Sequence, residues 1–112
     1  MAVDWNGHPK LPIYRRKLRR AARISIEVGC YITSTTDGTH SAGSYHYSKR
    51  AIDFGSSSGS NTPEKKAQEA LLRKFGARKF KELFGPAGFY VKDGRRYSGT
   101  FAGHHDHLHV AF

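Results

Sequence analysis

Cysteine is almost absent from this sequence: Cys30 is the only one among 112 residues. A single thiol cannot form an internal disulfide and excludes a zinc site built from several cysteines, so any metal must be bound by histidine, aspartate or glutamate. Long apolar runs are missing as well, since none approaches the roughly 18 residues of a membrane span. The N-terminus, MAVDWNGHPK, lacks the basic-then-apolar order of a signal peptide. These absences predict a protein that is made in the cytoplasm and has no membrane span.

Acidic residues are scarce too, with nine Asp and Glu against 19 Lys and Arg, which gives a formal net charge of +10. This excess predicts a polyanionic partner, for which nucleic acid and phosphate-bearing polymers of bacterial cell walls are the candidates. The densest group of cations lies in the first predicted helix and consists of Arg15, Arg16, Arg19, Arg20 and Arg23. One such arginine is typical of a solvated helix face, but their density makes this helix the best candidate for a polyanion-binding surface.

Apolar residues with helical spacing predict three helices, over residues 13–28, 62–75 and 79–84. Tyr14 belongs to the apolar stripe of the first helix. Thr62 is the expected N-cap of the second helix, because a side-chain oxygen at that position can accept a free backbone N–H. In the third helix, Phe80, Leu83 and Phe84 are expected to face the core.

Strand patterns predict a small sheet. The expected strands cover residues 30–34, 50–54 and 107–112, and a hairpin covers residues 88–99. The hairpin turns at Asp93-Gly94, a favoured pair for a two-residue turn. Residues 1–12 form an extended lead-in, and the length predicts a single domain over residues 1–112. The sum is an α+β fold with a small, mainly antiparallel sheet and helices packed on one face.

The first segment with candidate ligands is SYHYSKRAID, residues 44–53. Asp53 lies in a predicted strand between Ile52 and Phe54, where a carboxylate is costly unless it is paired or binds a metal. Hydrogen bonding of Asp53 to a nearby loop is the alternative interpretation. The presence of His46 seven positions earlier favours metal binding.

The second segment, GHHDHLHVAF, contains four of the seven histidines. Strand alternation places His107 and His109 on one face, with the intervening Leu108 directed to the core. His104 and His105 are each interpreted as exposed loop residues. Two imidazoles on one strand face beside a carboxylate are typical of a metal site.

Two histidines and one aspartate are a usual protein ligand set for a catalytic zinc ion with an open position for water. Zinc lowers the pKa of that water to about 7 and polarises a carbonyl group. Amide hydrolysis also requires a general base, and Asp106 is the only carboxylate in the second segment. In a regular strand Asp106 would point away from His109, so this role requires irregular backbone that turns its carboxylate inward.

SYHYSKRAID resembles the Ser-x-His-x-x-Gly-x-Ala-x-Asp motif of zinc D-alanyl-D-alanine carboxypeptidases and the related L-alanyl-D-glutamate endolysin peptidases. These families share their fold with the hedgehog signalling domain. DHLH, residues 106–109, resembles their closing Asp/Glu-x-x-His motif. The likeness extends over most of residues 13–112 and is nearest to the compact peptidase domains of phage lysis or tail proteins.

The resemblance implies that Zn²⁺ is bound by His46, Asp53 and His109. It implies that Asp106 is the general base and that His107 donates a hydrogen bond to the substrate or transition state. These roles are expectations from the motif match.

Other positions either match the motif or depart from it. Ser44 matches the motif serine, which implies that it steadies the site by hydrogen bonding. Lys49 stands where the motif has glycine, which predicts a different backbone path. Members of these families often have an arginine or glutamine shortly before the first ligand to stabilise an oxyanion. No arginine lies between Ile24 and Lys49, so His40 or Arg50 is the candidate for that role.

The implied function is a zinc-dependent peptidase that hydrolyses amide bonds in the stem peptides or cross-links of bacterial peptidoglycan. We expect a monomeric bacteriolytic hydrolase, either a phage endolysin released by a holin or a lysin carried in the virion, with the basic surface attracting anionic wall polymers. A His-rich metal-dependent nuclease is an alternative, disfavoured because the predicted helices contain no histidine. A non-catalytic hedgehog-like binding module is a second alternative, disfavoured by the retained Asp106.

Overall fold

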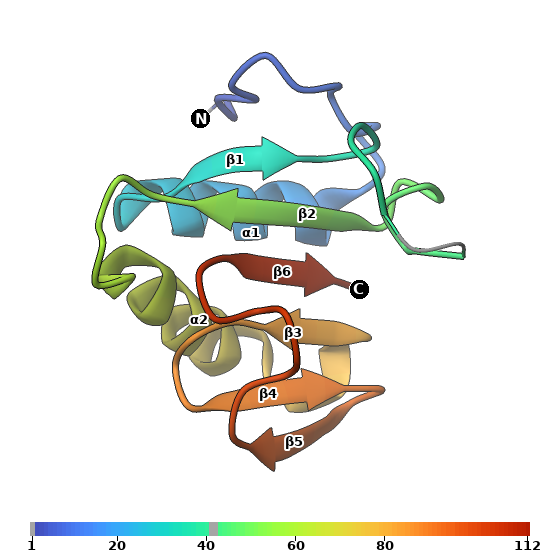
Figure 1. Ribbon diagram of the computed structural model, residues 1–112. Helices are drawn as coiled ribbons and strands as arrows, with labels where there is room; N and C mark the ends of the chain where they lie inside the picture. The colour runs from blue at the N-terminus through green and yellow to red at the C-terminus, as the bar shows by residue number, and fades with distance from the viewer. Residues whose placement is uncertain (1, 41–42) are drawn as a thin grey trace.

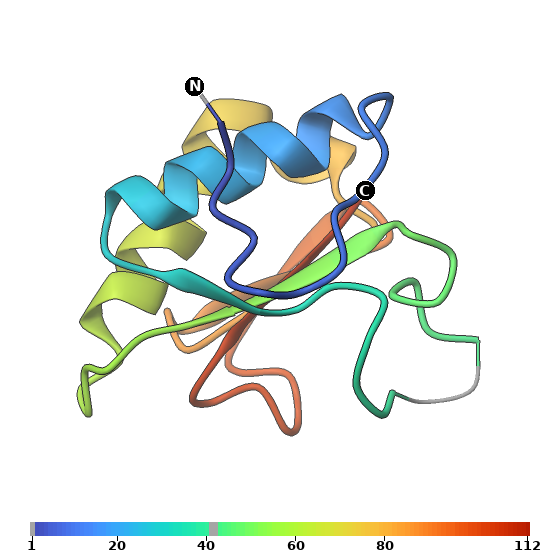
Figure 2. The same ribbon diagram turned by 90° about the horizontal axis from the view of Figure 1, so that it is seen from above.

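The fold consists of a six-stranded antiparallel sheet with two helices on one of its faces (Figures 1 and 2). This computed structural model describes residues 2–40 and 43–112. In chain order the elements are α1 (Arg16–Glu27), β1 (Tyr31–Ser34), β2 (Ala51–Gly55), α2 (Thr62–Phe75), the 3-10 turn η1 (Ala77–Lys79), β3 (Glu82–Phe84), β4 (Phe89–Lys92), β5 (Arg95–Ser98) and β6 (Leu108–Ala111). The strand order is β1-β2-β6-β3-β4-β5. The predicted α+β class, with a small antiparallel sheet, is confirmed.

The core lies between the sheet and the two helices. Alternate residues of the central strands point to the helices, so Ile52 of β2 and Leu108 and Val110 of β6 are fully buried. The helices pack against these residues through small and branched side chains, including Ala21 of α1 and Leu71 of α2. Within the part of the chain that the structure describes, no helix lies on the opposite face of the sheet (Figure 2), which is covered in part by loops.

The first helix differs from its predicted start, and the second covers its predicted residues but has a different N-cap. The first begins at Arg16, three residues after its predicted start, because Arg15 has a non-helical backbone. Tyr14 is 68% exposed and therefore does not belong to the buried stripe. The N-cap of α2 is Asn61, not Thr62, which is already helical, and no side chain caps that end. Neither helix has the length and apolar character needed to cross a membrane.

The predicted helix over residues 79–84 is wrong. Residues 82–84 form β3, which pairs with β6 on one side and β4 on the other. The spacing of Phe80, Leu83 and Phe84 fits a helix, and all three are buried as expected. Pairing with strands distant in sequence outweighs this short local pattern. The consequence is that Leu83 faces the helices whereas its neighbours Glu82 and Phe84 face the open side of the sheet.

The predicted hairpin is confirmed as β4 and β5. Its turn residues, Asp93 and Gly94, have φ values of +50° and +80°. Positive φ at both central positions is the requirement of the type I′ turn, whose twist matches that of the flanking strands. Phe89 and Val91 of β4 are buried, so the hairpin extends the sheet beside β3.

Candidate metal centre

Strand pairing brings the candidate ligands together on the open face of the sheet. Asp53 of β2 lies directly opposite His109 of β6, and His109 lies opposite Phe84 of β3. Residues paired in this way have Cβ atoms about 4.5–5.5 Å apart. His46 comes from the loop before β2, and its ring contacts both Asp53 and His109.

Three donor atoms form a small triangle. The Oδ1 atom of Asp53 lies 2.8 Å from Nδ1 of His109 and 3.2 Å from Nε2 of His46. The two histidine nitrogens are 3.2 Å apart. Zinc–ligand distances of about 2.0–2.1 Å with tetrahedral angles require donor separations of about 3.3 Å. All three observed edges are shorter than that separation and are of hydrogen-bond length, so these atoms are close enough together to share one ion.

Hydrogen bonds fix the ring of His46. Its Nδ1 atom donates to the carbonyl oxygen of Thr35 at 2.6 Å, which leaves the Nε2 lone pair directed at Asp53. The backbone N–H of His46 donates to the hydroxyl of Ser44 at 3.2 Å, which is the kind of contact that the motif match implies for this serine. His46 is only 1% exposed, so its orientation is set before any metal arrives.

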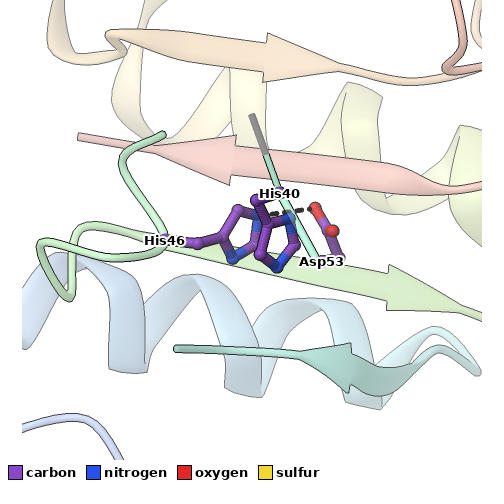
Figure 3. A group of neighbouring side chains, drawn as sticks. All are labelled: His40, His46 and Asp53. Carbon is purple, nitrogen blue, oxygen red and sulfur yellow. Dashed lines mark ion pairs between the residues drawn. The ribbon is translucent and has the colours of Figure 1, made fainter. Parts of the chain in front are cut away.

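His40 lies beside this triangle. Its ring stacks on that of His46 with a centroid separation of 3.8 Å (Figure 3). His40, His46 and Asp53 form a group that could hold a metal ion, with donor atoms within 4.8 Å of one another. The Nε2 atom of His40 contacts the carbonyl oxygen of Asp37 at 2.9 Å. If Nε2 carries the proton of the neutral ring, Nδ1 is an acceptor, which suits a metal ligand better than the predicted oxyanion donor.

His109 is held between two carboxylates. Its Nδ1 atom lies 2.8 Å from Asp53, and its Nε2 atom lies 2.8 Å from Oε1 of Glu82. Burial by itself lowers the pKa of His109, but the hydrogen bonds to the two carboxylates outweigh burial and raise it to about 9. Burial raises the pKa of Asp53, but hydrogen bonds from His109 and His46 hold it well below its usual range.

Glu82 is the residue of the site that sequence reasoning missed. A carboxylate that accepts the N–H of a ligating histidine fixes the ring and increases the basicity of the other nitrogen. The helix predicted over residues 79–84 hid this role, because its apolar pattern assigns a core-facing side to Phe80, Leu83 and Phe84 and says nothing about Glu82. The sequence contains only a weak signal: Gly85-Pro86 ends the predicted segment after six residues, a length that is short for a helix and equally compatible with a strand.

Asp106 and His107 form a pair at the edge of the site. Nδ1 of His107 lies 3.0 Å from Oδ1 of Asp106, and the Asp106 side chain is 83% exposed. This hydrogen bond lowers the pKa of Asp106. Of the two, only His107 lines the cavity above the donor triangle. The inward-pointing carboxylate that the base role requires is therefore not seen, and Asp106 reaches the site through His107.

The cavity above the triangle has a volume of about 460 Å³ and an aromatic wall. Phe84 stacks on Phe101 with centroids 4.1 Å apart and also contacts the ring of His109. His104 lines the cavity and is half-buried, which corrects its interpretation as an exposed loop residue. His105 is exposed as expected.

Two further expectations about the site change. Lys49 has φ of +61°, the left-handed conformation that glycine favours, so lysine at the motif glycine does not by itself require a different backbone conformation there. Arg50 does not line the metal cavity. Its position outside that cavity removes Arg50 as a candidate for stabilising an oxyanion there, and its Nε donates to a backbone oxygen of Phe112.

Comparison of the chain with protein families, curated proteins and solved structures gives no match.

Proposed function

We propose that the protein is a zinc-dependent peptidase that hydrolyses amide bonds in bacterial peptidoglycan. The observation that supports this most is the donor triangle of His46, Asp53 and His109, whose edges of 2.8–3.2 Å need to lengthen only slightly to surround a tetrahedral ion. Both histidines have their second nitrogen engaged by an oxygen, as metal-ligating histidines usually do. Bound zinc supplies a Lewis acid that polarises the substrate carbonyl and lowers the pKa of water to about 7.

The Asp106–His107 pair is proposed to move the proton. The Nδ1 proton of His107 is directed to Asp106, so the Nε2 atom is the ring position left to accept a proton from attacking water. The same atom then returns the proton to the leaving amine. Asp106 orients the ring and stabilises its charged form. This arrangement keeps the proposed role of the Asp106 carboxylate but routes the proton through its neighbour.

The cavity supplies the substrate site. Phe84 and Phe101 offer an apolar wall for aliphatic parts of a peptide, whereas Ser44 and His104 offer polar contacts. A cavity of about 460 Å³ accommodates a few residues of a stem peptide. The excess of basic residues attracts the anionic wall, which raises the rate of encounter.

His40 is the observation that favours a second candidate. A fourth donor beside the triangle would close the coordination shell, which is typical of structural zinc rather than catalytic zinc. The protein would then be a non-catalytic binding module. Replacement of His40 by alanine separates the two functions. If the protein is a peptidase and His40 lies outside the metal shell, His40→Ala keeps wall hydrolysis. If the site is structural and His40 is its fourth ligand, His40→Ala loses zinc affinity.

The test of the proposed function is release of peptide fragments from purified walls, detected by mass spectrometry with and without a chelator. His46→Ala should bind little zinc and release no fragments, whereas His105→Ala, an exposed histidine of the same cluster, should behave as wild type. Asp106→Asn should keep zinc and lose about 10²–10⁴-fold in rate. Wild-type activity of Asp106→Asn, or digestion of nucleic acid in place of walls, would overturn the proposal.

A further inference from the structure

A second cavity, of about 390 Å³, lies at the start of α1. Four cationic side chains line it, together with Tyr14 and Phe112, and no acidic residue does. The four cations are Arg15, Arg16, Lys17 and Arg50. Three of these come from consecutive positions, whereas Arg50 precedes β2, so the fold brings together cations from distant parts of the chain.

No acidic side chain among the described residues neutralises the charge of this cavity, and the Nε of Arg50 donates to a backbone oxygen of Phe112 at 3.2 Å. Among residues 2–40 and 43–112, the one ion pair made by a lysine or arginine is Lys92–Glu82, on the other side of the sheet's middle strands. The side chain of Arg15 makes a single long hydrogen bond, from Nη2 to the carbonyl oxygen of Ser48 at 3.4 Å. Its Nε atom is buried and has no partner within the described chain. A buried donor without an acceptor is costly, and a phosphate that draws the guanidinium outward would satisfy it.

The adjacent helix end adds donors to the same place. No acidic residue lies in the first turn of α1, and no side chain caps it. The backbone N–H groups of Arg16, Lys17 and Leu18 have no acceptor among the described residues. Free amides at a helix start favour an anion, and guanidinium forks match the geometry of phosphate oxygens.

We propose that this cavity binds a phosphate group, and that its occupant is the phosphodiester of a polyol-phosphate polymer of the cell wall. The choice of occupant rests on the proposed function, whereas phosphate binding does not. The segment before β2 separates the two cavities: Tyr45 lines the metal cavity, and the guanidinium of Arg50 lies 5.8 Å from the Tyr45 ring. A polymer held at Arg15 and Arg50 therefore keeps the neighbouring wall peptides close to the metal centre.

The first experiment titrates the full-length protein with inorganic phosphate and follows backbone amide resonances by NMR. The largest shifts are expected at Arg16 and Lys17. Arg15→Lys keeps the charge but loses the planar fork, so it should weaken binding about tenfold or more. The matched control is Arg73→Lys, an exposed arginine of α2. Equal affinity of Arg15→Lys and the control would show general charge attraction and would overturn the site.

The second experiment identifies the source of the phosphate. Poly(glycerol phosphate), a single-stranded oligonucleotide of the same charge and phosphatidylglycerol vesicles are compared at one ionic strength. The proposal expects the first to bind most tightly, and expects Arg15→Lys to reduce that binding more than the Arg73→Lys control does. Tighter binding of the oligonucleotide or the vesicles through Arg15 would overturn the assigned occupant. Both titrations read binding alone, so they give an answer even if the protein hydrolyses no wall.

Discussion

Replacement of Glu82 by glutamine tests the hydrogen bond that holds His109 in the proposed centre. The Oε1 atom of Glu82 accepts the Nε2 proton of His109 at 2.8 Å, and this leaves Nδ1 directed at Asp53. Loss of a carboxylate behind a ligating histidine typically lowers metal affinity by about 10–100-fold. We expect the zinc dissociation constant of Glu82→Gln to rise by about that factor near pH 9.

The pH dependence of the loss is a more specific prediction. Zinc must displace the Nδ1 proton of His109, whose pKa is raised to about 9 in the metal-free protein. Wild-type affinity should therefore fall about tenfold per pH unit below 9. Glu82→Gln removes one of the two carboxylates that raise the pKa of His109, so this pKa is lower in the variant. The zinc affinity of the variant therefore falls less steeply than that of wild type as the pH decreases below 9. The ratio of the zinc affinities of wild type and Glu82→Gln should be largest near pH 9 and should decrease towards pH 6.

The assay is competition for zinc with a chelator of known affinity at several pH values between 6 and 9. Lys92→Met is the matched control, because it removes the other ionic partner of Glu82, at 3.7 Å, without touching His109. A pair at 3.7 Å whose lysine is 45% exposed contributes little, so the control should bind zinc as wild type does. Equal affinities of wild type and Glu82→Gln at pH 9, or a ratio that is constant over the pH range, would refute the reasoning.

Three further predictions concern Cys30, Lys49 and the metal-free state of His109. Cys30 is 4% exposed, and burial raises the pKa of its thiol to about 12, so native protein should react with an alkylating reagent far more slowly than unfolded protein; rapid native labelling would contradict this. Lys49→Gly relieves a left-handed residue and should raise the free energy of unfolding by up to about 1 kcal/mol, measured in urea. Charged His109 stabilises the metal-free protein fully below its unfolded pKa of about 6.5, so the melting temperature with chelator should fall as pH rises towards 9.

The sequence was most informative where local chemistry decides the structure. Asp93-Gly94 specifies its turn by positive φ alone, and the alternation around Leu108 specifies which side of β6 faces the core. The spacing of His46 and Asp53 predicts a shared site because one residue lies just before a strand and the other lies in it. In each case residues that are close together in the sequence determine the local structure.

Long-range pairing is what the sequence could not supply. Glu82 enters the site only because β3 pairs with β6, and nothing within a few residues of Glu82 specifies that partner. The same limit applies to Thr35, whose carbonyl oxygen orients His46 from another loop. Asp106 shows the reverse error, since its motif position suggests a carboxylate inside the cavity whereas the structure has it hydrogen-bonded to His107 and exposed.

The position of β6 between β2 and β3 also determines when the protein can fold. This strand follows all the others in the chain, yet it joins the β1-β2 pair to the β3-β4-β5 group. During synthesis both groups must wait with unpaired strand edges until residues 108–111 leave the ribosome, and contacts so distant in sequence form slowly. His109 arrives in that same strand. The donor triangle of the candidate metal centre therefore cannot form before β6 joins the sheet.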